Sequence, residues 1–189
     1  FEQLAPLPRS PVLVIDFPHV STSGQRRGYE RRGPRWHNPA EVAAVIEVLK
    51  HLRARRGEHP TLAVLSPYNA QVDHLKTRIY ALLDGELSHL KQFEPVRTAG
   101  FVGTVDSFQG SEADLVVLSL VRNNARVGTS ALGFLRDRRR LNVAISRAKS
   151  QLVIVGSLSF LREAVRGVNP DGDGKHELSF LTAVLNKID

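Results

Sequence analysis

The sequence contains no cysteine. Disulfide bonds and thiolate metal sites are therefore excluded, which fits an intracellular protein of the cytoplasm, nucleus or nucleoid. The absence of methionine favours a piece of a longer chain over a complete translation product. No apolar run approaches the roughly 20 residues that a membrane-spanning helix needs, and no N-terminal secretory signal is evident. We therefore expect no membrane partner.

Metal-binding patterns are also missing. The seven histidines form no H-x-x-x-H pair or other zinc pattern. A metal-dependent nuclease would have to use four acidic residues that lack the spacing of a metal site, namely Asp16, Asp106, Glu112 and Asp114. Residues 172–176 resemble the end of a phosphate-binding loop, but its first glycine and the hydroxyl residue after Lys175 are absent. We predict no metal site, and the nuclease is the weakest alternative.

What the sequence has in excess is positive charge. Its formal net charge is +7 and its pI is near 10.2, a balance that indicates a polyanionic partner such as nucleic acid. Residues 17–37 contain five arginines and three glycines without hydrophobic periodicity. We predict a mobile basic loop there, longer than most connections. It either contacts a nucleic-acid backbone or is a disordered insertion.

Short apolar runs alternate with helical patterns along the chain. The runs that are typical of strands buried on both faces of a parallel sheet are residues 12–16, 61–65, 101–105, 115–120 and 152–155. The spacing of apolar residues predicts helices at residues 38–55, 69–83, 138–148, 159–166 and 176–187. Asn38, Pro39 and Glu41 form a capping sequence at the first of them. This alternation predicts an α/β fold, with a mainly parallel sheet covered by helices on both faces.

Two arginines in the predicted helix 138–148 are candidates for an anion site. Arg140 and Arg147 are seven residues apart, so they should share one face of the helix. Guanidinium groups suit phosphate, because each binds two oxygens and keeps its charge. The alternative is a basic surface turn that is paired with Asp137 and Glu163.

The loop at residues 106–112 is the second candidate. Gln109 can donate and accept hydrogen bonds, Gly110 permits close approach to the backbone, and Glu112 can accept from sugar hydroxyls. Open α/β sheets bind ligands at the ends of their strands, so we expect a ligand site here. The alternative is a plain turn in which Ser111 caps a short helix.

Four blocks of the sequence resemble, in the same order, blocks of the superfamily 1B helicases of the up-frameshift and senataxin kind. V-G-T-V-D-S-F-Q-G-S-E-A-D-L from Val102 resembles their motif V, and R-R-L-N-V-A-I-S-R-A-K from Arg139 resembles their motif VI. N-x-x-E at residues 38–41 and L-A-V-L-S-P-Y-N-A-Q from Leu62 match further blocks. The resemblance covers residues 12–161.

This resemblance implies a three-layer RecA-like fold, in which residues 1–189 form the second, C-terminal RecA-like domain of a motor. Such motors walk 5′ to 3′ on single-stranded RNA or DNA. The resemblance identifies Arg147 as the arginine finger, the residue that reaches the γ-phosphate of ATP. The other residues that it assigns to the nucleotide site are Gln109, Gly110, Glu112 and Arg140. The residues that it places nearer the nucleic acid are Ser66, Pro67, Tyr68 and Thr104.

The family holds ATP and Mg²⁺ with motifs that this chain lacks. No G-x-x-x-x-G-K-[S/T] sequence occurs, and no Asp-Glu pair follows a strand. We therefore expect the chain to be inactive alone and to act with the N-terminal RecA-like domain of the same parent. The alternative is a RecA-like module that binds nucleic acid or protein without turnover.

Overall fold

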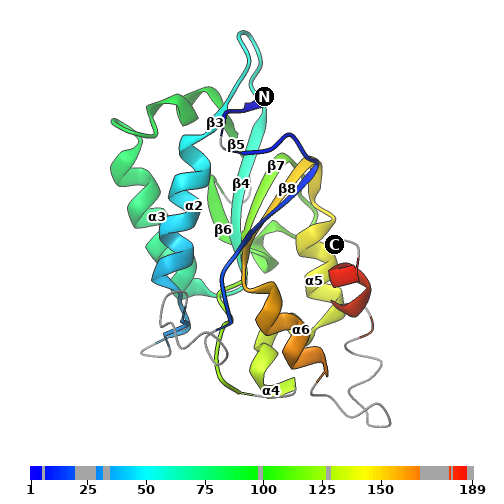
Figure 1. The fold of residues 1–189 in the computed structure, drawn as a ribbon. Helices are drawn as coiled ribbons and strands as arrows, with labels where there is room; N and C mark the ends of the chain where they lie inside the picture. The colour runs from blue at the N-terminus through cyan, green and yellow to red at the C-terminus, as the bar shows by residue number, and fades with distance from the viewer. Residues whose placement is uncertain are drawn as a thin grey trace.

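A parallel sheet of six strands forms the centre of the molecule (Figure 1). The computed structural model describes residues 1–5, 7–19, 29–31, 35–97, 100–126, 129–166, 179 and 181–186. More than half of the predicted basic loop at residues 17–37, and all of residues 172–176, lie outside these ranges. The strand order is β2-β8-β7-β4-β5, and β6 also pairs with β4. The bounds are β2 Val12–Asp16, β8 Ala148–Gly156, β7 Ala113–Ser119, β4 Thr61–Ser66, β5 Glu94–Pro95 and β6 Val102–Thr104.

The central strands are buried on both faces, which explains why their sequences do not alternate. The last five residues of β4, the last five of β7 and the last six of β8 are all buried. Every pair in this sheet is parallel, which confirms the predicted α/β class. β8 begins at Ala148, four residues before the predicted run, because its exposed start still pairs with β7.

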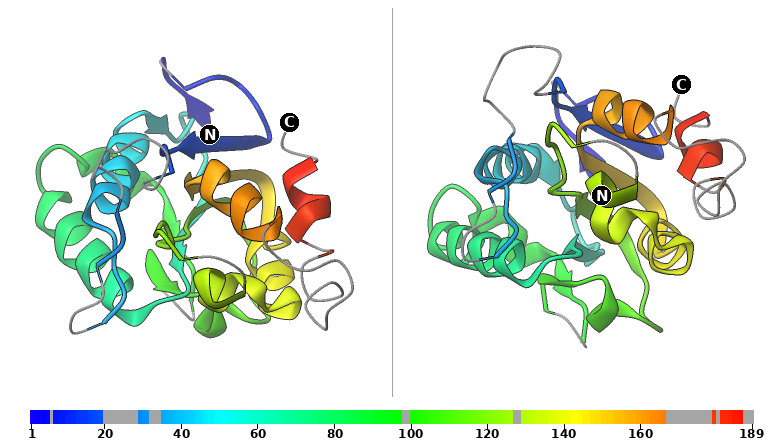
Figure 2. Two further views of the ribbon diagram at one scale, coloured as in Figure 1. Left: turned by 60° about the horizontal axis from the view of Figure 1, so that its bottom comes forward. Right: turned by 90° about the horizontal axis from the view of Figure 1, so that it is seen from below.

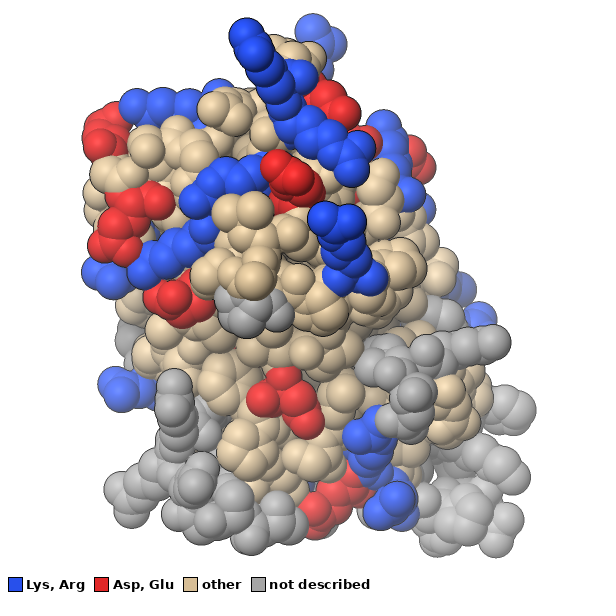
Figure 3. Space-filling model, turned by 45° about the horizontal axis from the view of Figure 1, so that its top comes forward, with Lys and Arg blue, Asp and Glu red and all other residues tan. Residues whose placement is uncertain are grey.

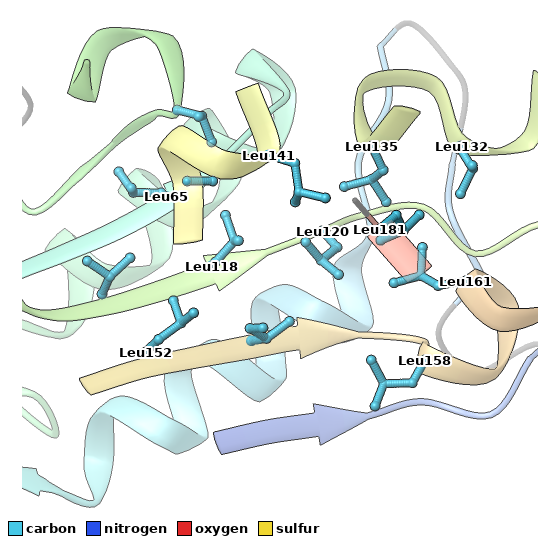
Figure 4. Packing of buried hydrophobic residues seen from close by; sticks show 14 of the residues in the cluster. Leu65, Leu118, Leu120, Leu132, Leu135, Leu141, Leu152, Leu158, Leu161 and Leu181 are labelled. Carbon is cyan, nitrogen blue, oxygen red and sulfur yellow. The ribbon is translucent and has the colours of Figure 1, made fainter. Parts of the chain in front are cut away.

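Helices cover both faces of the sheet, which gives three layers (Figure 2). On one face, α2 (Pro39–Lys50) and α3 (Asn69–Leu82) bury an apolar stripe against β4, β7 and β8. On the other face lie α4 (Thr129–Leu132), α5 (Arg138–Ile145) and α6 (Leu158–Arg166). In that core Leu118 and Leu141 meet, and Leu181 from the short helix at residues 181–186 packs near Leu161 (Figure 4). The three-layer fold is therefore confirmed.

The start of the chain differs from the prediction. α2 ends at Lys50 rather than near residue 55, because the chain turns at His51 into β3 (Leu52–Arg53). β3 pairs in antiparallel fashion with β1 (Glu2–Gln3), a two-stranded sheet that the sequence did not predict. Among the described residues, no helix combines the length and the apolar character that crossing a bilayer requires.

Gly156 is a packing constraint at the end of β8. A Cβ atom there would lie 2.9 Å from Cδ1 and 3.1 Å from Cβ of the buried Leu120. Gly156→Ala should therefore lower the free energy of unfolding by about 1–3 kcal/mol, as overpacked cores do. Gly85→Ala is the matched control, since its nearest neighbour would be the Leu82 carbonyl oxygen at 3.9 Å. Urea denaturation measures both, and equal stabilities for the two variants would contradict the expectation.

Candidate functional site

The candidate residues other than Arg140 divide between the two edges of the parallel sheet. Ala113 pairs with Ala148 where β7 and β8 begin, so the loop at residues 109–112 and Arg147 both lie at the amino edge. Ser66 pairs with Thr104 where β4 and β6 end, at the carboxyl edge. The seven residues of β7 separate the two edges by about 20 Å. The loop at residues 106–112 runs from the end of β6 to the start of β7, so its residues 109–112 lie at the edge opposite to the one where open α/β sheets bind ligands.

The loop before β7 is open to solvent beside Arg147. Gln109, Gly110 and Glu112 are all exposed. Gly110 has a φ of 83°, a conformation that favours glycine, and nothing lies within 4 Å of the place a Cβ would take. The Ala113 amide donates to the Arg147 carbonyl at 3.1 Å, which joins this loop to the segment before β8. The alternative in which Ser111 caps a helix is wrong, since a strand follows.

Arg147 does not belong to the helix in which it was predicted. α5 ends at Ile145, and Arg147 lies in the following turn, because the next residue already pairs with Ala113 in the sheet. Its guanidinium donates to Ser146 Oγ from Nε at 3.3 Å and from an Nη at 2.9 Å. No carboxylate among the described residues forms an ion pair with it. This half-buried guanidinium therefore has hydrogen-bonding capacity to offer a ligand.

Arg140 lies near the start of α5, whereas Arg147 follows its end, and the guanidinium carbon of Arg140 is 5.5 Å from the centroid of the Phe134 ring. Its Nε is 3.3 Å from a carboxylate oxygen of Asp106 and 3.7 Å from one of Asp137. Asp137 also caps α5 by accepting from the amides of Arg139 and Arg140. The surface-turn alternative is thus correct for Asp137. Its negative charge interacts favourably with the positive end of the helix dipole and with the arginines at the start of α5.

The other acid in that alternative, Glu163, contacts a different side chain. It forms a 2.8 Å bond with His19 Nδ1. The predicted sharing of one helix face by Arg140 and Arg147 is wrong in its geometry, because the helix stops between them. Whether both residues contact one nucleotide stays a prediction.

At the carboxyl edge, the residues predicted near nucleic acid surround the end of β4. Ser66 is fully buried, and Pro67 and Tyr68 are half-buried. The Tyr68 hydroxyl accepts from the Phe134 amide at 3.2 Å, and burial raises the pKa of Tyr68. Thr104 Oγ1 accepts from the Ser107 amide at 3.0 Å. This edge therefore presents the ring of Tyr68 and the hydroxyl of Thr104, whereas the Ser66 side chain is 0% exposed.

A buried polar network behind this edge was not predicted. The Glu41 carboxylate, which is 0% exposed, accepts from Ser119 Oγ at 2.6 Å and from the Val121 amide at 2.8 Å. Gln71 donates to Ser119 Oγ at 2.9 Å and accepts from the Asn38 amide at 2.8 Å. Asn38 does cap α2 as predicted, through the Glu41 amide. The capping sequence therefore also ties α2 to α3 and to the end of β7.

Val121 adopts a strained conformation at the centre of this network. Its φ is 71°, which is rare for a β-branched residue. The Arg122 amide donates to the Leu120 carbonyl at 2.8 Å across it, which closes a γ-turn of the rare kind. Burial raises the pKa of Glu41 to about 8, although the bonds from Ser119 and Val121 lower it. Strained backbone conformations cluster at functional sites, so the turn at Val121 and the buried Glu41 carboxyl that binds its amide point to a functional role for this edge.

A second unpredicted cluster follows the turn. Arg122 Nε lies 3.2 Å from Glu30 Oε2, and both side chains are 2% exposed. The same carboxylate oxygen accepts from the Asn123 amide at 3.1 Å and from Asn124 Nδ2 at 3.0 Å. Burial raises the pKa of Glu30, while its bond from Asn124 and the charge of Arg122 lower it. The only signal in the sequence was the polar R-N-N after an apolar strand.

The four acidic residues of the nuclease alternative do not meet. Asp16 Oδ1 accepts from the Leu158 amide at the carboxyl edge, whereas Asp114 accepts from the Thr61 amide and hydroxyl at the amino edge. Asp106 pairs with Arg140. Within the described ranges, no group of three or more His, Asp or Glu residues is placed to hold a metal ion. The geometry therefore gives the nuclease no support.

Comparison with known proteins identifies the kind of protein that this chain resembles. A family described as an AAA domain matches residues 2–159. The DNA polymerase alpha-associated DNA helicase A of Saccharomyces cerevisiae is 40% identical over 126 residues, which cover 67% of this chain and 16% of that protein. The probable helicase senataxin of Homo sapiens is 34% identical over 158 residues, covering 82% of this chain and 5% of that protein. The regulator of nonsense transcripts 1 homolog of Drosophila melanogaster is 32% identical over 154 residues, which cover 77% of this chain and 12% of that protein. The chain thus spans a small part of the length of these relatives.

Glu41→Gln should flatten the pH dependence of unfolding. The folded carboxyl, with a pKa of about 8, keeps its proton while the unfolded one loses it near 4.5, so wild-type stability should fall as pH rises between these values. Glu30 adds to this fall, and His89, whose pKa burial lowers, opposes it only up to about 6.5. Glutamine does not titrate, so the fall above pH 6.5 should shrink.

Urea denaturation from pH 6.5 to 8 measures this difference. Glu47→Gln is the control, because Glu47 lies on the same helix with its side chain 63% exposed. It should keep the wild-type slope. A Glu41→Gln slope equal to that of the wild type would show that the buried carboxyl is not protonated.

Proposed function

The chain belongs to the superfamily 1B helicases, and on that premise we propose that it is the C-terminal RecA-like motor domain of an ATP-dependent helicase. In this proposal residues 1–189 form one domain, which supplies half of a cleft. The other half is an N-terminal RecA-like domain of the same parent chain, which holds ATP and Mg²⁺. We propose that the parent acts inside the cell. This division follows from the sequence, since the chain contains no phosphate-binding loop of its own.

One observation carries the proposal: Arg147 has no acidic partner among the described residues and lies beside the open loop at residues 109–112. Two other arginines, Arg122 after β7 and Arg140 in α5, are differently placed, because each faces a carboxylate. Arg122 is buried against Glu30, and Arg140 is tied to Asp106. A guanidinium that donates to a serine hydroxyl, and to no carboxylate within the described ranges, can bind phosphate oxygens with two donors at once.

The residues at the amino edge fit a nucleotide by their chemistry. In the closed cleft, Arg147 would stabilise the negative charge that develops on the γ-phosphate during hydrolysis. Glu112 would accept a hydrogen bond from a ribose hydroxyl, and Gln109 would contact the nucleotide from the same loop. Gly110 lets the loop approach closely, since no side chain stands there. Mg²⁺ would be held outside this chain.

The opposite edge fits a single strand of nucleic acid. Ser66, Tyr68 and Thr104 gather where β4 and β6 end, and Pro67 completes the turn. The face shown in Figure 3, with the β1–β3 end brought forward, mixes basic and acidic side chains rather than forming one basic patch. We therefore assign the strand to the carboxyl edge. Either RNA or DNA would bind there, and the parent would move along it from 5′ to 3′.

A non-catalytic binding module is the second candidate. It is favoured by the same absence of a phosphate-binding loop from this sequence. The two candidates differ in what Arg147 does. In a motor its removal abolishes hydrolysis, whereas in a module there is no hydrolysis to lose.

Arg147→Ala in the full-length parent should reduce nucleic-acid-stimulated ATP hydrolysis by roughly 10³–10⁵-fold, as the loss of arginine fingers does. Arg147→Lys should also be strongly impaired, because lysine lacks the two-pronged guanidinium. Arg138→Ala is the matched control, since Arg138 is an exposed arginine that directly precedes the motif VI block. Steady-state release of phosphate measures all three.

The control should stay within a few-fold of the wild type. Hydrolysis by Arg147→Ala that also stays within a few-fold would remove the finger assignment. A wild-type parent that binds single strands but never hydrolyses ATP would favour the binding module.

A further inference from the structure

A cluster of two arginines on a tryptophan extends the carboxyl edge beyond the residues assigned above. Trp36 is the only tryptophan of the chain, and it is half-buried. The guanidinium carbon of Arg122 lies 4.3 Å from the centroid of its ring, and that of Arg126 lies 5.8 Å away. Both distances are in the range of cation–π contacts.

The two arginines are held very differently. Arg122 is 2% exposed and donates to the Ala131 carbonyl from Nε at 3.0 Å and from an Nη at 2.7 Å, in addition to its pair with Glu30. Arg126 is exposed and lies over the ring at the longer distance. Arg122 is thus fixed beside the ring by several bonds, whereas Arg126 is at the surface and lies farther from the ring.

The cluster is continuous with the predicted nucleic-acid residues. A Cβ on Gly133 would lie 2.7 Å from the Tyr68 hydroxyl and 3.5 Å from Cζ of Arg122, so these two side chains are neighbours. Tyr68 also packs edge-on against Phe134, with ring centroids 6.5 Å apart. Phe134, Tyr68, Arg122 and Trp36 therefore form a continuous row of aromatic and basic groups.

We propose that Trp36 is a stacking platform for a base of single-stranded nucleic acid, with Arg126 binding the adjacent phosphate. Aromatic rings interleaved with arginines are how sequence-independent single-strand sites work, because every base has a π face and every nucleotide carries a charge. The proposal rests on the proposed function, since that function places the strand at the carboxyl edge. It adds a contact at residue 36, outside the motifs that identify the family.

The single tryptophan allows a direct test with the 189-residue chain. Fluorescein-labelled oligothymidine and oligouridine of about 20 nucleotides report binding by anisotropy, and unlabelled strands report on Trp36 by its emission. Stacking should quench the emission in a saturable way, at the same strand concentrations that raise the anisotropy. Both signals should weaken steeply as salt increases. The two oligonucleotides show whether the platform prefers DNA or RNA.

Variants separate stacking from support of Arg122. Trp36→Leu should weaken binding about tenfold, as the loss of one stacked base does, whereas Trp36→Phe keeps a ring and should stay within about threefold. Arg126→Ala should weaken binding by several-fold and reduce the salt dependence. Arg56→Ala, which removes an exposed arginine elsewhere, controls for net charge and should have a smaller effect. Thermal unfolding by circular dichroism confirms that each variant is folded.

The proposal is overturned if neither strand binds, if binding leaves Trp36 emission unchanged, or if folded Trp36→Leu binds as the wild type does. A purely structural role for Trp36 would give the last result. These outcomes are distinct from failure of the motor, which the Arg147 variants of the parent report through ATP hydrolysis. If Arg147→Ala abolishes hydrolysis in the parent while strand binding leaves the emission of Trp36 unchanged in the 189-residue chain, only the stacking proposal is overturned.

Discussion

The parallel ladder between β7 and β8 is the constraint on which both candidate sites depend. At its amino end the Ala113 amide donates to the Arg147 carbonyl, which fixes the open loop before β7 against the arginine before β8. At its carboxyl end Ser119 pairs with Val155 and donates to the buried Glu41. Because the strands between are buried on both faces and close-packed, the two ends cannot shift independently.

The carboxyl end of this ladder stores strain beside the proposed strand site. The chain leaves β7 through Val121, which has a left-handed conformation. The Glu41 carboxyl accepts a hydrogen bond from the Val121 amide. Arg122 then enters the interior, where it meets Glu30 and supports Trp36. A strained turn persists only where the surrounding structure fixes its conformation, and here the buried carboxyl does so. It places Trp36 and Tyr68 on the same edge, next to one guanidinium.

The sequence predicted the parts of this protein that depend on local pattern. Unalternating apolar runs indicated buried parallel strands, and the capping sequence at Asn38 marked the start of α2 correctly. The end of α5 was misjudged because helical spacing continues through Arg147, whereas pairing of the next residue with Ala113 ends the helix. No local pattern contains that long-range bond.

The same limit applies to the candidate site. In the sequence, Arg122 and Arg147 are both arginines next to an apolar strand, and nothing local distinguishes them. The fold shows that Arg122 is buried against Glu30, whereas Arg147 contacts Ser146. The buried network of Glu41 joins three distant segments, so its members looked like separate helix and strand residues. The resemblance of the motifs identified the family, and the register of the strands divided the motif residues between two edges.

The central claim is that nucleotide and nucleic acid use opposite edges of one sheet. The most direct measurement is a residue-resolved map of amide chemical shifts as the chain is titrated with single-stranded oligothymidine. The account predicts shifts that concentrate at Tyr68, Thr104 and Asn123, while Gly110, Glu112 and the turn after α5 stay unchanged. Shifts that concentrate instead around Gly110 and Arg147 would contradict it.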